Sequence, residues 1–499
     1  MATNEPPPRP SAGPPGVSSS RVAGLLSWLV PGVCAAALGG WRLTGASLWA
    51  DELATWGAVR STWVRLWELS GSVDAVLTPY YAVTKAYATV AGTGTAALRL
   101  PSVVAIVGAT VVVAVLGRRL GGAGAGFTAG LVFALLPVTS RYAQEARPYA
   151  FVILASAVAV LALDRALARP TPGRLAGYAA ACAAAGLLHP LSGLLLLAGH
   201  AVGAGWWCLT TAGADRSRRT GRRWLVAAGV GASPAVLLGW WGAGQTGQVS
   251  WIRPVDLDIL AAVPEQLFLS AAAGGLVLGA AVTGVRRTRT AGCLAAAAFV
   301  PLVSLLVAGV RLDVWVARYV LVVLPPLAVL AGYALTRSGR RATVGVLCLL
   351  VVLVVPAQVR IRAEAGHGQA SARIATVIGP RQLPGDVVVF PDTHRSIPWS
   401  ARDVYERYLP APRPPDVLRT APPRTDGRLA AVECPDAACL GAPPRVWVVR
   451  VDSPADPLAD MAAGKQDRIR REYRVVHRWR EPLLGITLLE RRPGMTIEN

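Results

Sequence analysis

Uninterrupted apolar segments, each about 20 residues long, recur along most of the first 360 residues of this chain. A helix of that length crosses the hydrocarbon layer of a bilayer, and its lipid-facing side chains must be apolar. Only 16% of the residues are charged, against roughly a quarter in soluble domains. These features exclude an ordinary soluble enzyme and a disordered protein. They predict an all-α polytopic membrane protein.

The apolar segments predict about 11 to 13 transmembrane helices, a number set by the 20-residue span length. The first, Val22–Gly40, follows a Pro- and Ser-rich tail at 1–20 that is expected to be disordered. No small-residue cleavage site follows it, so it is interpreted as a span and not as a signal peptide. Further spans are expected at 98–117, 123–140, 148–168, 174–189, 190–210, 224–241, 265–284, 291–310, 318–336 and 342–359.

One helical segment, Thr78–Gly92, does not fit this series, because a full crossing there would break the parity of the spans. A re-entrant, a short and a tilted helix all remain open, as does a wrong boundary elsewhere in the series. The multi-span domain is therefore assigned to residues 21–359, with a first external loop at 41–78.

The net charge of +21 reflects topology rather than a nucleic-acid partner, because the basic residues are spread over short loops between apolar segments. Alternate loops are rich in arginine: Arg118, Arg119, Arg165, Arg169, Arg174, Arg216, Arg218, Arg219, Arg222, Arg223, Arg286, Arg287, Arg289, Arg337, Arg340 and Arg341. The other loops hold most acids: Asp51, Glu52, Glu68, Asp74, Glu145, Asp256, Asp258, Glu265 and Asp313. The positive-inside rule makes the first set cytoplasmic, together with the N-terminus.

Residues 360–499 have a different character and predict a small α/β domain, which parity places outside the cytoplasm. Short strands are expected at 387–390, 445–449, 474–479 and 486–490, and helices at 366–378 and 401–409. Cys434 and Cys439 lie close enough in this domain to form a disulfide in an oxidising compartment. The protein is thus expected in the plasma membrane as a multi-pass protein.

The first external loop contains two adjacent carboxylates, Asp51 and Glu52. Trp49, Trp56 and Trp63 are spaced by seven residues around them, which predicts one amphipathic helix lying in the membrane interface. Such a helix would hold the acidic pair at the membrane boundary. A merely solvated loop is the alternative interpretation.

The segment Ser140–Tyr149 lies on the same side and contains Glu145, Arg141 and Arg147 between two apolar spans. A polar turn whose Pro148 opens the next helix explains part of this segment. It does not explain the three charges, so a functional site is expected here.

Four motifs follow one another along the chain: the Asp51-Glu52 pair, Pro79-Tyr80-Tyr81, Arg-Leu-Pro-Ser at 99–102, and Tyr-Ala-Gln-Glu-Ala-Arg-Pro-Tyr at 142–149. In this order and spacing, the sequence resembles GT-C glycosyltransferases of the protein-mannosyltransferase and aminoarabinose-transferase type. Arg318-Tyr319 followed by Leu324-Pro325 resembles a later feature of the same family. The resemblance covers residues 22–340 and leaves the tail without a counterpart.

The resemblance implies transfer of a hexose, with mannose as the most frequent sugar of the family, from a polyprenyl-phosphate donor on the outer face. Asp51 is implied as the catalytic base or its neighbour, with Glu52 and Glu145 as further catalytic carboxylates. An acceptor hydroxyl must lose its proton as it attacks the anomeric carbon, so a carboxylate within hydrogen-bond reach is required. The lipid phosphate leaves without a general acid, but it requires cations where its charge develops. An inverting hexosyltransferase is expected.

Three cations are candidates for that phosphate: Lys85, Arg147 and Arg318. Lys85 is the first of only two lysines in the chain, and snorkelling to the membrane interface is its alternative role. Tyr80, Tyr81 and Tyr149 are expected to bind substrate.

The other polar groups leave several roles open. Glu145 is expected to orient the surroundings of Asp51, to bind sugar hydroxyls or to share a divalent ion such as Mg²⁺ or Mn²⁺. The sequence assigns no metal ligands and no certain cofactor. His189, before Pro190, is expected to be structural.

Two other functions compete with a glycosyltransferase. A transporter or flippase would show internal repeats and ionisable residues near the middle of its spans, and neither is found here. A non-catalytic subunit of cell-envelope polysaccharide assembly is opposed only by the acidic pair. The expected partners are a polyprenyl-phosphate sugar, membrane lipid and an acceptor that is a protein, a lipid or a glycan.

Overall fold

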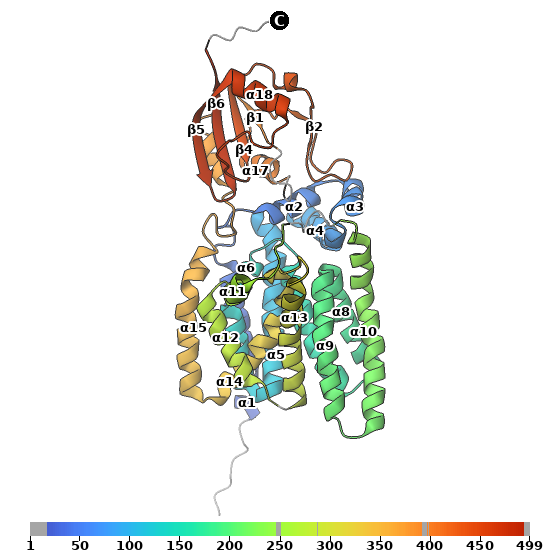
Figure 1. The fold of residues 1–499 in the computed structure, drawn as a ribbon. Coiled ribbons are helices and arrows are strands. Elements are labelled where there is room, and N and C mark those ends of the chain that lie inside the picture. The colour runs from blue at the N-terminus through green and yellow to red at the C-terminus, as the bar shows by residue number, and fades with distance from the viewer. Residues whose placement is uncertain (1–16, 246–250, 287, 392–396, 398, 494–499) are drawn as a thin grey trace, which may run out of the picture.

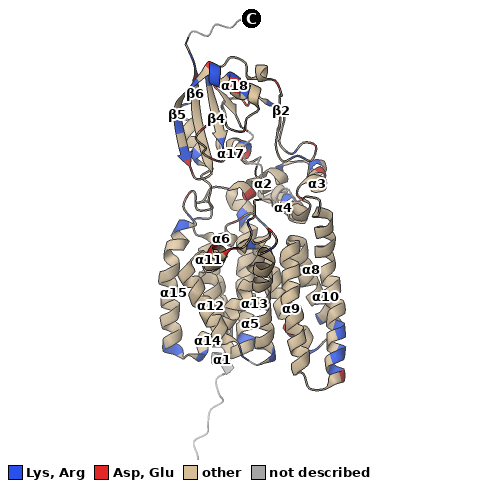
Figure 2. Ribbon diagram, in the orientation of Figure 1, with Lys and Arg blue, Asp and Glu red and all other residues tan. Residues whose placement is uncertain are grey.

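The computed structural model describes residues 17–245, 251–286, 288–391, 397 and 399–493. Figure 1 shows a bundle of long helices with a small sheet domain stacked on one end and short helices between the two. We call this the domain end of the bundle and the other the opposite end. Arginines gather at the opposite end, at the lower ends of α10 and α15 (Figure 2).

The bundle is built from helices that follow the apolar segments of the sequence. They are α1 (Val17–Gly40), α5 (Thr95–Leu135), α6 (Pro137–Ala143), α7 (Tyr149–Ala168), α8 (Pro172–Leu188), α9 (Pro190–Thr210), α10 (Ala214–Gly242), α11 (Leu257–Phe268), α12 (Ala271–Gly284), α13 (Arg289–Gly309), η3 (Ala317–Val323), α14 (Leu324–Arg337) and α15 (Arg340–Arg360).

Eight helical segments among the described residues are long and apolar enough to cross a membrane, and the bent pair α11–α12 makes a ninth. One of the eight, α5, folds back on itself at Gly121 and Gly122, where Gly122 has a φ of 84°. The two arms pack so closely that a Cβ at Gly126 would meet the Ala114 carbonyl oxygen at 2.6 Å. Counting both arms of α5 and adding the 17-residue α8 gives eleven helical segments among the described residues, at the lower end of the predicted 11 to 13.

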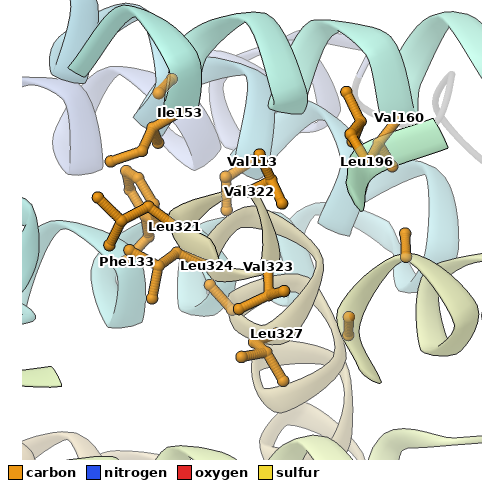
Figure 3. Close-up of a cluster of buried hydrophobic side chains, with 14 of the residues drawn as sticks. Val113, Phe133, Ile153, Val160, Leu196, Leu321, Val322, Val323, Leu324 and Leu327 are labelled. Carbon is orange, nitrogen blue, oxygen red and sulfur yellow. The ribbon is translucent and has the colours of Figure 1, made fainter. Parts of the chain in front are cut away.

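The packed interior of the bundle is aliphatic. Figure 3 shows Val113 and Phe133 from the two arms of α5 lying near Ile153 of α7 and near Leu321 and Leu324 of the η3–α14 segment. All five side chains are buried. This core fixes where the loops at the domain end emerge.

The segment Thr78–Gly92, whose full crossing would break the parity of the spans, does not cross the bundle. It forms α4 (Thr78–Ala91), which lies with α2 (Ala50–Arg60), α3 (Trp63–Ser72) and η1 (Ala75–Leu77) between the bundle and the sheet domain (Figure 1). The short-helix alternative therefore holds.

The predicted single amphipathic helix with three tryptophans on one face is wrong. The chain breaks between α2 and α3, where the Thr62 side chain accepts a hydrogen bond from the Arg65 N–H. Trp56 is buried under the C-terminal domain, whereas Trp63 is 54% exposed. The reason is tertiary, because α2 is covered on both sides and only α3 keeps an outer apolar face.

The C-terminal domain has a four-stranded sheet in the order β1-β4-β6-β5, in which β1 and β4 are parallel and the other pairs antiparallel. Its elements are α16 (Arg373–Ile378), β1 (Val387–Val389), α17 (Ser400–Tyr408), β2 (Arg419–Ala421), β3 (Val432–Glu433), η4 (Ala437–Leu440), β4 (Arg445–Arg450), α18 (Ala463–Glu472), β5 (Tyr473–Glu481) and β6 (Leu484–Arg491). The four predicted strands coincide with β1, β4, β5 and β6. The helix expected at 366–378 is shorter and begins at Arg373.

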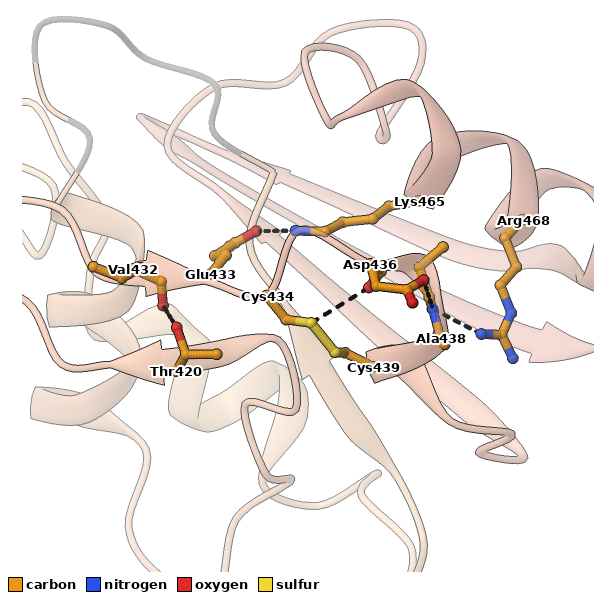
Figure 4. Close-up of a disulfide and its surroundings, with 10 residues drawn as sticks. Thr420, Val432, Glu433, Cys434, Asp436, Ala438, Cys439, Lys465 and Arg468 are labelled. Carbon is orange, nitrogen blue, oxygen red and sulfur yellow. Dashed lines mark hydrogen bonds and ion pairs between the residues drawn. A yellow bond between two sulfur atoms is a disulfide. The ribbon is translucent and has the colours of Figure 1, made fainter.

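One face of this sheet shares its core with the first loop. Trp447, Val449 and Ile486 belong to the same buried cluster as Leu53 and Trp56 of α2. Away from this face, Cys434 and Cys439 form a disulfide with a Cα–Cα distance of 6.4 Å (Figure 4). The C-terminal domain is therefore packed onto α2 and is no loosely tethered appendage.

Candidate active site

A cavity of about 490 Å³ lies at the domain end, where α2, the loop before α7, η3 and the C-terminal domain meet. Its walls combine charged, aromatic and aliphatic side chains. They are formed by Trp49, Ala50, Asp51, Ala54, Asp74, Val76, Leu77, Tyr81, Arg147, Tyr149, His189, Trp251, Arg318, Tyr319, Ile397, Trp399 and Leu483. The cavity is large enough for a small ligand such as a sugar phosphate.

Asp51 lies in the first turn of α2 and faces this cavity. Both peptide groups of the preceding Ala50 are held by the C-terminal domain: its N–H donates to Gln369 Oε1 at 2.8 Å, and its carbonyl accepts from Trp399 Nε1 at 3.1 Å. The Asp51 Oδ2 atom is buried and has no hydrogen-bond partner. The structure therefore fixes the backbone of Asp51 and leaves one carboxylate oxygen available.

Two arginines accompany this carboxylate. Arg147 Nη2 lies 3.9 Å and Arg318 Nη2 3.7 Å from Asp51 Oδ2. Arg147 is held in place by donating to the Tyr81 hydroxyl at 3.1 Å and to the Asp51 carbonyl at 3.3 Å. The Nε atoms of both arginines are buried without a partner. The site thus combines one carboxylate with two guanidinium groups that retain unused donors.

Aromatic rings surround the Arg318 guanidinium. Its Cζ atom lies 5.5 Å from the ring centroid of Trp251, 5.8 Å from those of Trp49 and Tyr319, and 6.0 Å from that of Tyr149. Cation–π contacts of this kind hold a guanidinium without neutralising it. Arg318 therefore remains able to bind an anion.

Glu52, predicted as catalytic, is a structural residue here. It is fully buried and accepts hydrogen bonds from Arg99 Nε at 2.8 Å, Arg99 Nη2 at 2.7 Å and the Ala146 N–H at 2.9 Å, with His367 Nδ1 at 3.2 Å. Burial favours the neutral acid, but the charge and hydrogen bonds of Arg99 outweigh it and hold the pKa of Glu52 below its ordinary value. Adjacent helix positions point about 100° apart, so Asp51 and Glu52 cannot share one site.

Arg99 and His367 complete this buried cluster. Arg99 also donates to the carbonyls of Leu43 and Ala46, each at 2.9 Å. Burial and the Arg141 charge lower the pKa of His367 to about 3, so the ring is neutral and is assigned as donating from Nδ1 to Glu52. The cluster ties α2 to the start of α5 and to the segment that follows α15.

Glu145 lies beside the cavity but does not line it. Its carboxylate accepts from Arg141 Nη1 at 2.5 Å and from Trp49 Nε1 at 3.2 Å. Burial raises the pKa of Glu145 above its ordinary value, an effect that Arg141 partly offsets. Of the three roles left open, orientation of the Asp51 surroundings fits these contacts, because Trp49 is a wall of the cavity.

Lys85 is not among the lining residues. Its ammonium group donates to the carbonyl oxygens of Val59 (3.0 Å) and Ser61, at the C-terminal end of α2. Cations favour that end of a helix, so these contacts stabilise α2. The phosphate role predicted for Lys85 therefore has no contact in the structure to support it.

Of the three tyrosines expected to bind substrate, two line the cavity and one does not. Tyr81 and Tyr149 line the cavity, and the Tyr81 hydroxyl donates to Asp74 Oδ2 at 3.0 Å. Tyr80 is instead buried against Phe151, with their ring centroids 6.2 Å apart. Neighbouring positions on α4 point in different directions, which the sequence pair alone does not resolve.

No protein-family model and no curated protein matches the sequence. Solved structures do match. ArnT from Cupriavidus metallidurans bound to undecaprenyl phosphate aligns with a TM-score of 0.58 and 16% identity, covering 92% of this chain and 98% of that chain. The apo state of the same protein aligns with a TM-score of 0.55 and 16% identity, covering 95% and 97%.

The chain has the GT-C fold. The fold predicted from the motif order is therefore confirmed, and the C-terminal domain, which had no counterpart in the motifs, falls within the alignment. At this level of identity the likeness concerns the fold, so the roles of residues rest on the geometry of this chain.

Several residues that line this cavity were not expected from the sequence to belong to a site. Asp74 appeared only among the acids of the outer loops, whereas Trp251, Trp399 and Leu483 carried no motif. The last two lie about 350 and 430 residues beyond Asp51 along the chain, and only the fold brings them together. His189, expected to be structural, both caps α9 through the Ser192 N–H and lines the cavity.

The donor set does not fit a divalent ion held by the protein alone. No three His, Cys, Asp or Glu side chains gather anywhere in the described ranges. The charged neighbours of Asp51 within 4 Å are Arg147 and Arg318, which supply the positive charge that a metal would bring.

Proposed function

We propose that this protein is an inverting glycosyltransferase that moves a sugar from a polyprenyl-phosphate donor to an acceptor hydroxyl. The carrying observation is the Asp51 carboxylate, which lines the cavity with an oxygen that accepts no hydrogen bond and lies beside two guanidinium groups. The fold supports the donor class, because the similar ArnT structure holds undecaprenyl phosphate. A hexose is the proposed sugar, with mannose as the first candidate, and the acceptor is a protein, a lipid or a glycan.

The proposed reaction is a single displacement. The acceptor hydroxyl transfers its proton to Asp51 and its oxygen bonds to the anomeric carbon. The bond between that carbon and the phosphate oxygen breaks, and the electron pair leaves with the polyprenyl phosphate. Arg147 and Arg318 stabilise the charge that develops on this oxygen. Attack from the face opposite the leaving group inverts the configuration.

The domain end is proposed to face the outside of the plasma membrane. The arginine-rich loops lie at the opposite end (Figure 2), and the positive-inside rule assigns that end to the cytoplasm. A polyprenyl-phosphate donor in the outer leaflet would then reach the cavity from the membrane surface.

The direct test incubates the purified full-length protein in detergent with synthetic polyprenyl-phosphate hexoses and a membrane extract as acceptor, and follows release of polyprenyl phosphate. Release that requires both the extract and Asp51 supports the proposal. A folded wild-type protein that releases no polyprenyl phosphate from any donor would contradict it. Addition of EDTA is expected to leave the rate unchanged, because the two arginines serve the leaving group.

A further inference from the structure

A second cavity lies far from the proposed active site, on the outer surface of the bundle between α8 and α10 near the opposite end. It has a volume of about 710 Å³. Its floor is apolar and includes Leu175 of α8 and Val226 and Val230 of α10, of which the two valines are 64% and 60% exposed. The groove is therefore open to the hydrocarbon side of the membrane.

Three arginines form one end of this groove: Arg219, Arg222 and Arg223. Together with Val226 and Val230 they are spaced by three or four residues, so they follow one face of α10. The face changes from cationic to apolar over two to three turns, in the direction that leads from the membrane surface into the hydrocarbon. An amphiphile with an anionic head and an apolar chain has the same polarity.

The positive charge of this groove is not neutralised by the protein. Among the described residues, none of the three arginines forms an ion pair. Their one side-chain hydrogen bond runs from Arg223 Nη1 to the Pro170 carbonyl at 3.3 Å. Asp215 is the single acid of α10, against five arginines. Three exposed guanidinium groups so close together repel one another unless an anion binds them.

We propose that the groove between α8 and α10 is a binding site for one anionic phospholipid of the cytoplasmic leaflet. The lipid phosphate is held by Arg219, Arg222 and Arg223, whose guanidinium groups bind phosphate oxygens bidentately. One acyl chain lies along Leu175, Val226 and Val230. Basic pockets between transmembrane helices bind lipid head groups in this manner. The site is independent of the reaction carried out at the domain end.

The test uses native mass spectrometry of the full-length protein in detergent, titrated with phosphatidylglycerol or with phosphatidylcholine of the same acyl chains. Wild-type protein should bind one phosphatidylglycerol saturably and show no such site for phosphatidylcholine. The variant Arg219→Gln/Arg222→Gln/Arg223→Gln should bind it about 100-fold more weakly, since each arginine contributes about 1 kcal/mol. Inorganic phosphate should compete only weakly, because it lacks the chain.

The matched control is Arg286→Gln/Arg337→Gln/Arg341→Gln, which removes the same charge from the same end of the bundle but outside the groove. This control should bind as the wild type does. Equal loss in both variants, or unchanged binding in the groove variant, would overturn the proposal. Should the groove variant fail to fold, Arg219→Lys/Arg222→Lys/Arg223→Lys keeps the charge and should still bind, with an affinity that falls as salt is added. Salt-independent binding would also overturn the proposal.

Discussion

The two neighbouring carboxylates Asp51 and Glu52 lie in different environments in this protein. Asp51 faces a cavity with one oxygen unpartnered, whereas Glu52 is buried in an ion pair with Arg99. The direction in which each side chain leaves α2 decides which of the two reaches the cavity. The proposed chemistry therefore needs only Asp51.

Asp51→Asn should reduce turnover by about 10²–10⁴-fold, the usual contribution of a general base, and should leave donor affinity nearly intact. The change keeps the size of the side chain and removes its ability to accept a proton. The measurement is release of polyprenyl phosphate under saturating donor. Glu68→Gln, an exposed acid on neighbouring α3, is the control and should be neutral. Wild-type turnover by a folded Asp51→Asn protein would rule out this base.

Arg318→Gln should weaken donor binding and turnover together, by about 10- to 100-fold, because a charge-assisted hydrogen bond contributes about 1.5–3 kcal/mol. Arg318→Lys should recover part of this loss.

Lys85→Met should instead lower the thermal midpoint, since the Lys85 ammonium caps α2, and should change donor KM by less than about twofold. Equal losses of donor affinity in both variants would return the phosphate role to Lys85.

At the scale of elements, α2 is held between the bundle and the C-terminal domain. Trp399 and Gln369 bind the two peptide groups of Ala50, and the Tyr408 hydroxyl accepts from the Leu48 N–H at 2.7 Å. The Arg424 guanidinium lies against Gly57, where any Cβ would clash, and pairs with Asp403. The C-terminal domain therefore positions the helix that carries Asp51.

Trp399→Phe should reduce turnover several-fold and leave donor KM nearly unchanged, because it removes the hydrogen bond to the Ala50 carbonyl and keeps most of the apolar wall. Steady-state kinetics resolve the two parameters. Trp479→Phe, in the same domain but away from the cavity, is the control. An equal effect of both changes would show a general loss of stability rather than misplacement of Asp51.

The buried cluster of Glu52, Arg99 and His367 should make stability fall in acid. The folded pKa of His367 is about 3, below the ordinary histidine pKa of 6.5. Between these pH values the unfolded chain therefore binds a proton that the folded chain does not. Stability is present above pH 6.5 and is lost as the pH falls towards 3. Between pH 7.5 and 5, the thermal midpoint of the His367→Gln variant should therefore fall less than that of the wild type. The exposed His477→Gln should behave as wild type.

At the scale of the whole molecule, the two ends of the bundle differ in charge and in architecture. The domain end contains the cavity and the disulfide between Cys434 and Cys439, and the opposite end contains the arginine-rich loops (Figures 1 and 2). Structural disulfides occur mainly in oxidising compartments. Both features agree with a protein whose C-terminal domain lies outside the cytoplasm.

A reporter enzyme that is active only outside the cytoplasm should be active when fused after Asn499. The same reporter inserted at Gly339, between α14 and α15, should be inactive, because that turn lies at the arginine-rich end. Expression of both fusions is checked by immunoblot. An inactive but expressed C-terminal fusion, or an active one at Gly339, would reverse the proposed orientation.

The sequence by itself determined the features that depend on local composition and on order along the chain. Apolar length gave the spans, arginine placement gave the alternation of loops, and β-rich segments gave the four strands of the C-terminal sheet. The order of the motifs indicated the GT-C fold. It also brought Asp51, Arg147 and Arg318 together as candidates, and the structure places all three at one cavity.

Only the tertiary structure decided which side of each helix faces the site. It turned Glu52 and Tyr80 inward, joined Lys85 to the end of α2, and brought Trp399 and Leu483 to the cavity. A sequence motif fixes neighbours along the chain, but neighbours on a helix point about 100° apart. Contacts across several hundred residues arise from packing, which burial and shape complementarity of the whole fold select.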